Sequence, residues 1–207
     1  MFNVVTISRE YGSGGGMIAE MLAHRLGWKL VDKSLVAEVA RRAQIDAETA
    51  ARLDESVDPW FYHLVKGLWH GGYEGLATTV DVNIVDSEAM AKLGAEIIRE
   101  AAELGHCVIV GRGSQCILRN HKDAFHVSVF GPHHEKVNRL RERLAPGTDV
   151  ERLMDEADRR RAAYIQRIHR EDWKDRRLYH LVISSALGAE NVVDTIVRAA
   201  GLTPKVS

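Results

Sequence analysis

The chain has 207 residues, with 28 lysines and arginines against 29 aspartates and glutamates and a formal net charge of −1. This balance gives no electrostatic reason to expect binding to a nucleic acid polymer or to a membrane surface. The two cysteines, Cys107 and Cys116, are too few for a disulfide framework, and no stretch approaches the roughly 18–20 apolar residues that cross a bilayer. Met1 leads straight into a strand-like run with no targeting segment before it, so we expect a cytoplasmic globular protein.

The first part of the chain predicts a strand, a helix and a second strand. Residues 3–8 are mostly β-branched and apolar, as in a strand covered on both faces. Apolar residues recur at helical spacing over 18–26, and Gly27 is placed to end that helix. Residues 28–31 predict a short strand that ends at Asp32. Further helices are expected at 34–43, at 46–53 and, with an aromatic face, around 60–69.

The rest of the chain predicts three more strands separated by helices. The strands are expected at 107–110, 125–130 and 181–183. The helices are expected at about 86–104, in a short segment ending near 118, and at 135–144, 149–170 and 189–200, with a break in the 149–170 helix left open. Five strands that alternate with helices indicate an α/β protein with a mostly parallel, doubly wound sheet. Ligands bind such sheets where the strands end.

A dense group of glycines, Gly12-Ser13-Gly14-Gly15-Gly16, lies at the turn from the first strand to the first helix. Glycines there allow positive φ and close approach of a ligand, and free N–H groups at a helix start attract phosphate. The phosphate-loop pattern G-x-x-x-x-G-K-[ST], aligned on residues 9–16, matches only at Gly14. The dinucleotide pattern G-x-G-x-x-G fits Gly12 and Gly14 but meets Met17, and Asp32 would suit its ribose-binding acid. The two patterns alone leave both kinds of loop open.

The glycine loop and several segments after it together match the sequence pattern of one family. They are Ile7-Ser8-Arg9-Glu10-Tyr11-Gly12-Ser13-Gly14-Gly15, Asp32-Lys33, Gly111-Arg112-Gly113, Phe125-His126-Val127, Arg160-Arg161-Ala162-Ala163-Tyr164, Asp172-Trp173 and Leu187-Gly188. With these residues the chain resembles the cytidylate kinase-like family, bacterial relatives of the nucleoside monophosphate kinases, over nearly its whole length.

The resemblance implies a three-layer P-loop kinase fold with a central parallel sheet of about five strands. A single domain at 1–207 would include a helical acceptor-binding region at about 33–86 and a helical lid at about 149–177. It also implies ATP as phosphoryl donor, Mg²⁺ as metal, and a nucleoside monophosphate resembling CMP, or a related small molecule, as acceptor. Gly15 stands where the phosphate loop carries its lysine, and Gly16 where relatives of this branch often carry a basic residue. The alternative is therefore a nucleotide-binding protein without kinase activity.

Residues 11–16 are the expected phosphate-binding loop: Tyr11, Gly12, Ser13, Gly14, Gly15 and Gly16, with Ser13 touching phosphate or Mg²⁺. Arg9, directly after the first strand, is a candidate to supply the charge of the missing lysine, although an ordinary ion pair with Glu10 explains it equally well. Arg112, between two glycines at the end of a strand, is expected to grip the acceptor phosphate.

The remaining site residues depend more on the resemblance than on spacing. Arg161 and Arg167 in the lid are expected to serve in catalysis, and Asp32 and Lys33 to contact the acceptor, with an exposed pair at a helix start as an equal explanation for Lys33. The ten histidines lack the spacing of a metal site, so we expect them at the surface or in turns. A dinucleotide-dependent oxidoreductase is a distant third reading that a kinase-type strand order would exclude. Whether the chain forms homo-oligomers is left open.

Overall fold

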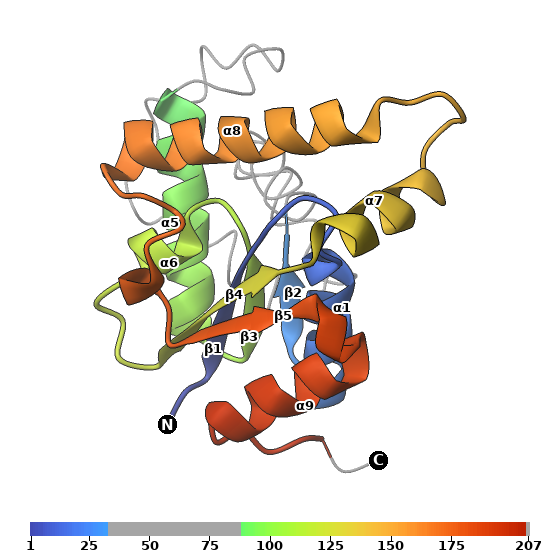
Figure 1. Ribbon diagram of the computed structural model, residues 1–207. Helices are drawn as coiled ribbons and strands as arrows, with labels where there is room; N and C mark the ends of the chain where they lie inside the picture. The colour runs from blue at the N-terminus through green and yellow to red at the C-terminus, as the bar shows by residue number, and fades with distance from the viewer. Residues whose placement is uncertain (33–87, 206–207) are drawn as a thin grey trace, which may run out of the picture.

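The computed structural model describes residues 1–32 and 88–205. Within them lies one sheet of parallel strands, β1 (Val4–Arg9), β2 (Lys29–Val31), β3 (Cys107–Val110), β4 (Ala124–Phe130) and β5 (Leu181–Ser184), in the order β2-β3-β1-β4-β5 (Figure 1). All four strand pairs are parallel, as predicted. Because β3 and not β2 lies beside β1, the order differs from the 3-2-1-4 arrangement of dinucleotide-binding domains, which removes the oxidoreductase reading.

The helices among the described residues follow the predicted ones closely. They are α1 (Gly15–Leu26), α5 (Glu88–Leu104), α6 (Ser114–Ile117), α7 (His133–Arg141), α8 (Val150–His169) and α9 (Ala189–Ala199). α8 has no break, and α7 begins and ends earlier than the predicted 135–144. The helices expected at 34–43, 46–53 and 60–69 lie outside the described residues, as does the whole expected acceptor region at about 33–86.

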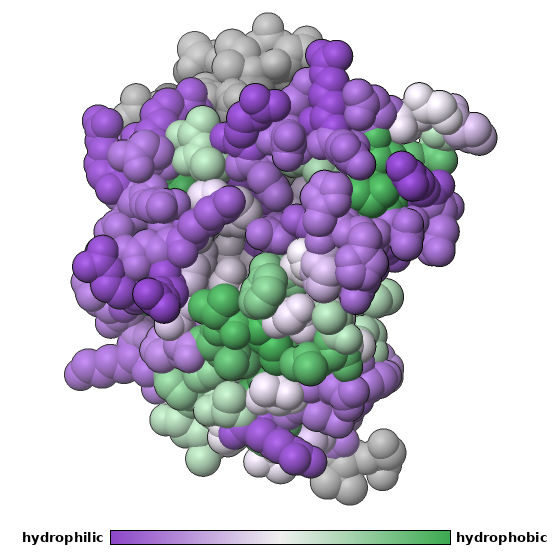
Figure 2. All heavy atoms as spheres, viewed as in Figure 1, coloured by the Kyte–Doolittle hydropathy of each residue, from purple (hydrophilic) through white to green (hydrophobic). Residues whose placement is uncertain are grey.

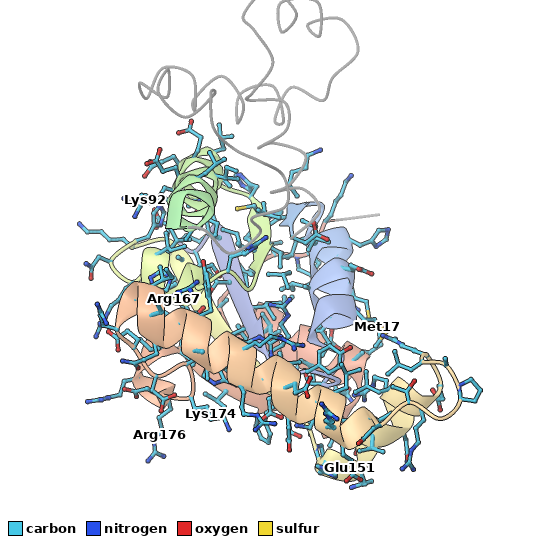
Figure 3. All side chains as sticks on the ribbon, turned by 90° about the horizontal axis from the view of Figure 1, so that it is seen from above. Met17, Lys92, Glu151, Arg167, Lys174 and Arg176 are labelled. Carbon is cyan, nitrogen blue, oxygen red and sulfur yellow. The ribbon has the colours of Figure 1, made fainter. Side chains whose placement is uncertain are left out.

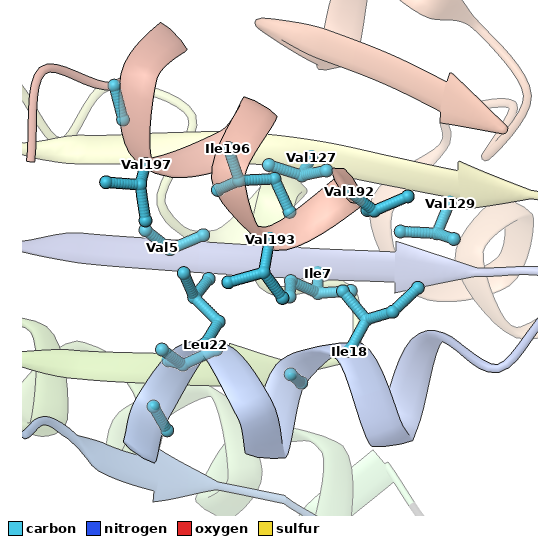
Figure 4. Packing of buried hydrophobic residues seen from close by; sticks show 14 of the residues in the cluster. Val5, Ile7, Ile18, Leu22, Val127, Val129, Val192, Val193, Ile196 and Val197 are labelled. Atoms are coloured by element: carbon cyan, nitrogen blue, oxygen red, sulfur yellow. The ribbon is translucent and has the colours of Figure 1, made fainter. Parts of the chain in front are cut away.

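One face of the sheet is covered by α1 and α9. Val5 and Ile7 of β1 are fully buried against Leu22 of α1 and against Val193 and Ile196 of α9 (Figure 4). This packing needs the apolar positions to recur at helical spacing on both helices, and the sequence supplies them in each. The burial fixes α1, and with it the glycine loop that precedes α1, against the sheet.

The other face is covered by α5 and α6 and is partly polar. Ile97 and Ile98 of α5 pack against Val4, completing three layers of helix, sheet and helix. Beside them, Thr6 and His126 share a buried hydrogen bond of 2.8 Å between Oγ1 and Nδ1. His126 is only 4% exposed, and burial is the main reason that its pKa falls from 6.5 to about 4. The expectation of surface histidines is wrong at this position, because a neutral imidazole can be buried where it has a hydrogen-bond partner.

α8 runs across the end of the molecule towards which β1 runs (Figure 1). It is joined to α7 by a small apolar cluster that includes Val137, Leu140 and Met154, with Tyr11 of the glycine loop packed against it. Phe130 at the end of β4, Val182 in the edge strand β5 and Leu187 after β5 are exposed, and Figure 2 shows apolar side chains gathered around β5 and polar ones over α8. No described helix combines the length and the apolar character needed to cross a membrane.

Candidate functional site

The loop between β1 and α1 turns through two glycines with positive φ. Gly12 has a φ of 79° and Gly14, the N-cap of α1, a φ of 80°, in the left-handed region that favours glycine. A Cβ on Gly12 would lie 2.9 Å from Cδ1 of Leu140 and 3.1 Å from Cβ of Lys136, so α7 packs closely on the loop. The path of the loop is therefore fixed both by its own dihedral angles and by a neighbouring helix.

Amide groups at the start of α1 are available to a ligand. The N–H groups of Gly15, Gly16 and Met17 lie in the first turn, where a helix offers no acceptor. Nor does any described residue accept a hydrogen bond from the N–H groups of Gly12 and Gly14. Donors clustered at the positive end of a helix dipole suit an anion such as a phosphate group.

Ser13 turns its side chain inward instead of towards this donor cluster. The residue is fully buried, and its hydroxyl donates to the carbonyl of Glu10 at 2.9 Å. A hydroxyl used this way stabilises the turn itself. Contact of Ser13 with phosphate or Mg²⁺ stays a prediction, while the backbone N–H groups of the loop are the accessible donors.

Arg9, the last residue of β1, fills the space beside the loop. A Cβ on Gly15 would lie 2.5 Å from Cβ and 3.1 Å from Cγ of Arg9, so the arginine stem occupies the place where a side chain at position 15 would begin. The Arg9 guanidinium lies against Gly111, whose Cβ would come within 3.1 Å of its Cζ. Strand register explains this contact, because Val110, the last residue of β3, pairs with Ile7, and the turn after β3 therefore lies beside the last two residues of β1.

The guanidinium of Arg9 is enclosed and crowded by positive charge. Burial is the main reason that the pKa of Arg9 falls from 12.5 to about 10, and the nearby charges of Arg161 and Arg112 add to the effect. The carboxylates of Asp32 and Asp158 act in the opposite direction. The group remains charged at neutral pH, and no described residue forms a hydrogen bond or ion pair with it. A largely buried cation without a partner is costly unless an anion supplies the missing interactions.

Arg112 follows β3 in a run of three residues with positive φ. The values are 72° at Gly111, 58° at Arg112 and 71° at Gly113. This conformation costs a non-glycine residue about 1 kcal/mol or more, and such strain is concentrated at functional sites. The side chain of Arg112 is half-buried and finds no hydrogen-bond or ion-pair partner in the part of the chain that the structure describes. Gly113 in turn is in close contact with Nε2 of His169, so the turn is held between Arg9 on one side and His169 on the other.

Asp158 on α8 ties this helix to the glycine loop. Its Oδ1 accepts the N–H of Tyr11 at 2.9 Å and Nη1 of Arg161 at 2.5 Å. Cζ of Arg161 also lies 5.4 Å from the ring centre of Trp173, within the range of a cation–π interaction. Burial lowers the pKa of Arg161, and the carboxylate of Asp158 raises it. Arg161 is therefore held by two partners at a position where its charge acts on Arg9.

A second ion pair, between Glu10 and Lys136, holds the glycine loop against α7, and the sequence analysis did not predict it. Nζ of Lys136 lies 2.7 Å from Oε2 of Glu10, and Lys136 is almost buried, with 10% of its side chain exposed. The N–H of Gly131 donates to the same oxygen at 3.3 Å, and Nη1 of Arg139 donates to the carbonyl of Gly12. The sequence predicted α7 only as a helix at 135–144. The signal that could have found these residues is Gly131-Pro132, which starts α7 where a strand ends at the ligand edge.

Of the remaining predicted site residues, Asp32 lies near Arg9, Lys33 is not described, and Arg167 lies elsewhere. Asp32 lies close enough to Arg9 to raise its pKa, and so belongs to the same group of charges. Lys33 lies outside the described residues. Arg167 lines a cavity towards α5 with Lys92 and Arg99, away from the glycine loop. The structure thus brings Arg9, Arg112, Arg161 and Asp32 together and leaves Arg167 at a separate place.

Comparison with known proteins identifies the family. Residues 4–187 match the model of the cytidylate kinase-like family. A curated cytidylate kinase from Shewanella sediminis is 33% identical over 79 residues, which are 38% of this chain and 34% of that protein. The chain is thus matched to about a third of the length of this curated relative.

Solved structures agree on the fold. An uncharacterised protein from Eubacterium ventriosum superposes with a TM-score of 0.67 at 22% identity, over 96% of this chain and 98% of the other. A tunicamycin resistance protein from Deinococcus radiodurans gives a TM-score of 0.53 at 15% identity over 100% of both chains. A shikimate kinase from Bacteroides thetaiotaomicron gives a TM-score of 0.51 at 15% identity, over 96% of this chain and 98% of the other. With its parallel β2-β3-β1-β4-β5 sheet, the chain belongs to the cytidylate kinase-like family and has the α/β fold of P-loop kinases.

Proposed function

We propose that this chain transfers a phosphoryl group from ATP, with Mg²⁺, to a small-molecule acceptor that is a nucleoside monophosphate resembling CMP or a related compound. The observation that carries the proposal is Arg9. Its stem fills the space at Gly15, where a phosphate loop normally carries its lysine, and its charged head has no partner among the described residues. A permanent cation placed beside free backbone donors is what the phosphates of a nucleotide require.

The glycine loop holds the donor phosphates in this proposal. The N–H groups of residues 12 and 14–17 have no acceptor among the described residues, and the loop shape is fixed by α7 and by Asp158 of α8. A preformed set of donors stabilises charge without having to reorganise when the ligand arrives. Phosphoryl transfer depends mainly on such positioning and charge stabilisation.

Arg9 and Arg161 supply positive charge beside this loop. A guanidinium can replace the missing lysine because it is always charged at neutral pH and presents paired N–H donors to phosphate oxygens. Arg112, in its strained turn, is assigned to the acceptor, since its side chain follows a strand at the ligand edge and is also without a described partner.

The residues present fit a nucleotide bound with Mg²⁺. No group of three or more His, Cys, Asp or Glu side chains in the described part of the chain could hold a metal by itself. Mg²⁺ does not need one, because it is usually bound by one or two carboxylates together with substrate phosphates. We assign Asp32 as that carboxylate, because its charge already acts on Arg9. When bound, the metal would neutralise part of the developing charge on the phosphates.

The test is a pair of measurements on the wild type and on Arg9→Gln. We expect the wild type to bind a non-hydrolysable ATP analogue and to phosphorylate at least one member of a nucleoside monophosphate panel. Arg9→Gln should lower kcat by about 10³-fold or more, as loss of an arginine finger does. Arg198→Gln, which removes an exposed arginine at the end of α9, is the control and should leave kcat unchanged.

Two results would change the assignment. Turnover by Arg9→Gln at the wild-type rate would show that Arg9 does not replace the lysine. Tight binding of the ATP analogue with no turnover of any acceptor would favour the alternative, a nucleotide-binding protein without kinase activity.

A further inference from the structure

A cavity of about 690 Å³ lies between α5, α6 and α8. Its lining residues are Ala91, Lys92, Ala95, Arg99, Cys116, Ile117, Arg167, Ile168, His169 and Arg170. Figure 3 labels Lys92 on α5 and Arg167 on α8, the two long helices that border it. A volume of this size is typical of pockets that bind small molecules.

The charge of the lining is strongly one-sided. Lys92, Arg99, Arg167 and Arg170 are cations, and the described lining contains no carboxylate. The side chains of Arg99 and Arg170 form no ion pair or hydrogen bond with any described residue. Like charges gathered in a concave site repel one another and raise the local concentration of anions. The chemistry of the cavity is therefore that of an anion site.

His169 adds a polar group without adding charge. Burial and the nearby charge of Arg99 lower the pKa of His169, against the opposite effect of the Glu171 carboxylate, and so favour the neutral imidazole. Its Nε2 is buried and has no hydrogen-bond partner among the described residues. The same side chain is in contact with Gly113. His169 therefore links the cavity to the Gly111–Gly113 turn.

The Gly111–Gly113 turn lies between Arg9 of the candidate phosphate site and His169, which lines the cavity. Gly111 is in contact with Arg9 on one side, and Gly113 with His169 on the other, with Arg112 between them. A molecule whose phosphate is held at Arg112 would thus have a second basic site next to it. Neither Phe, Tyr nor Trp contributes to the described lining, so the described residues of the cavity offer no aromatic ring for stacking a nucleobase.

We propose that the cavity between α5, α6 and α8 binds a second anionic group of the acceptor, which is then a compact molecule with at least two phosphate or carboxylate groups. The statement that the bound anion belongs to the acceptor rests on the proposed function, whereas the statement that the cavity binds an anion does not. The guanidinium groups of Arg99 and Arg170 are without described partners, and bidentate contacts to an anionic group would use both.

Inorganic pyrophosphate is the probe for the cavity, with orthophosphate for comparison. Titration calorimetry is done with a saturating non-hydrolysable ATP analogue, so that the glycine loop is occupied, and again on Arg9→Gln. We expect pyrophosphate to bind more tightly than orthophosphate in both proteins. Arg99→Gln and Arg170→Gln should each weaken pyrophosphate binding at least about tenfold, because each removes charge-assisted hydrogen bonds.

The matched control is Arg176→Gln. It makes the same charge change at an exposed arginine that Figure 3 shows on the side of α8 opposite to Lys92. Binding of the ATP analogue should be unchanged in Arg99→Gln, Arg170→Gln and Arg176→Gln. Equal weakening of pyrophosphate binding by all three variants would overturn the inference, as would the absence of pyrophosphate binding in protein that still binds the ATP analogue.

A second experiment tests whether the anion in the cavity is part of the acceptor or a separate polyanion. Turnover of a nucleoside bisphosphate and a sugar bisphosphate is compared with that of the matching monophosphates. If the acceptor carries the second group, the bisphosphate should have the lower KM, and Arg99→Gln should remove that difference in KM. If pyrophosphate binding depends on Arg99 but no bisphosphate is preferred, the claim about the acceptor is refuted and a free polyanion occupies the cavity. Failure of ATP binding with Arg99-dependent pyrophosphate binding would refute the proposed function alone.

Discussion

Two neighbouring glycines allow a direct test of the position of Arg9. A Cβ at Gly15 would lie 2.5 Å from Cβ of Arg9, whereas a Cβ at Gly16 would have no atom within 4 Å. Neither residue has a positive φ, so alanine is compatible with the backbone at both. The same substitution one residue apart should therefore have opposite effects on stability.

Gly16→Ala should raise the free energy of unfolding by about 0.5–1 kcal/mol, because alanine lowers the entropy of the unfolded chain and favours helix. Gly15→Ala gains the same amount, but carbon atoms prefer separations of about 3.5–4.0 Å, so the Arg9 stem must move by roughly 1 Å in a buried site. Overpacking of that kind costs about 1–3 kcal/mol. The two variants should consequently differ by about 1–3 kcal/mol, with Gly15→Ala the less stable.

Urea unfolding followed by circular dichroism measures this difference, and an unchanged m-value is the control that the unfolded states are comparable. For a chain of this size, 1 kcal/mol corresponds to about 2–4 °C in Tm, so thermal unfolding is an independent measurement. Displacement of Arg9 should also weaken binding of the ATP analogue by Gly15→Ala and not by Gly16→Ala. If both variants are stabilised equally, the Arg9 stem does not occupy the space at Gly15 and its assignment as the replacement for the lysine loses its basis.

Three further outcomes are expected. Arg112→Ala should weaken acceptor binding by about 1.5–3 kcal/mol and leave binding of the ATP analogue nearly unchanged in calorimetry, and equal losses for both ligands would show Arg112 to be structural. Asp158→Ala should lower the free energy of unfolding, measured in urea, by about 2–3 kcal/mol, because the N–H of Tyr11 and the guanidinium of Arg161 both lose their acceptor. An unchanged free energy of unfolding would show that water replaces the carboxylate and would contradict this prediction. The pKa of His126 is lower in the folded chain, about 4, than in the unfolded chain, about 6.5. The free energy of unfolding should therefore be highest above about pH 6.5 and should fall by about 3 kcal/mol as the pH is lowered to 4. A flatter pH dependence of urea unfolding in His126→Gln checks this, and an identical dependence would contradict it.

The sequence predicts the fold well because its signals are local and repeated. Strand and helix periods place all of the described strands to within one or two residues, and the two-sided burial of β1 follows from its continuous apolar run. The order of the strands is not a local property. Periodicity alone does not show that β3 lies beside β1, and it is this pairing that brings Gly111 against Arg9.

The candidate site could be predicted only in part. Arg9, Arg112 and Asp32 follow strands, and the ends of parallel strands meet at one edge, so their proximity follows from topology. Arg161 and Arg167 lie on one helix six residues apart and therefore point in different directions, which helical spacing could have indicated. The support of the loop by Lys136 requires a long-range contact between α7 and the residues after β1, which helical periodicity does not show; only the start of α7 at Gly131-Pro132, where a strand ends, indicates that α7 lies near the ligand edge.

The hydrogen bond from the N–H of Tyr11 to Asp158 also makes one amide of this chain a reporter of helix movement. Exchange of that proton for deuterium requires α8 to separate from the glycine loop, because the acceptor belongs to α8 and not to the loop itself. The exchange rate at Tyr11 therefore measures the free energy of this separation, without a label and without turnover. A ligand that contacts both α8 and the glycine loop would stabilise this hydrogen bond and slow the exchange, so the rate at a single backbone position would report its binding.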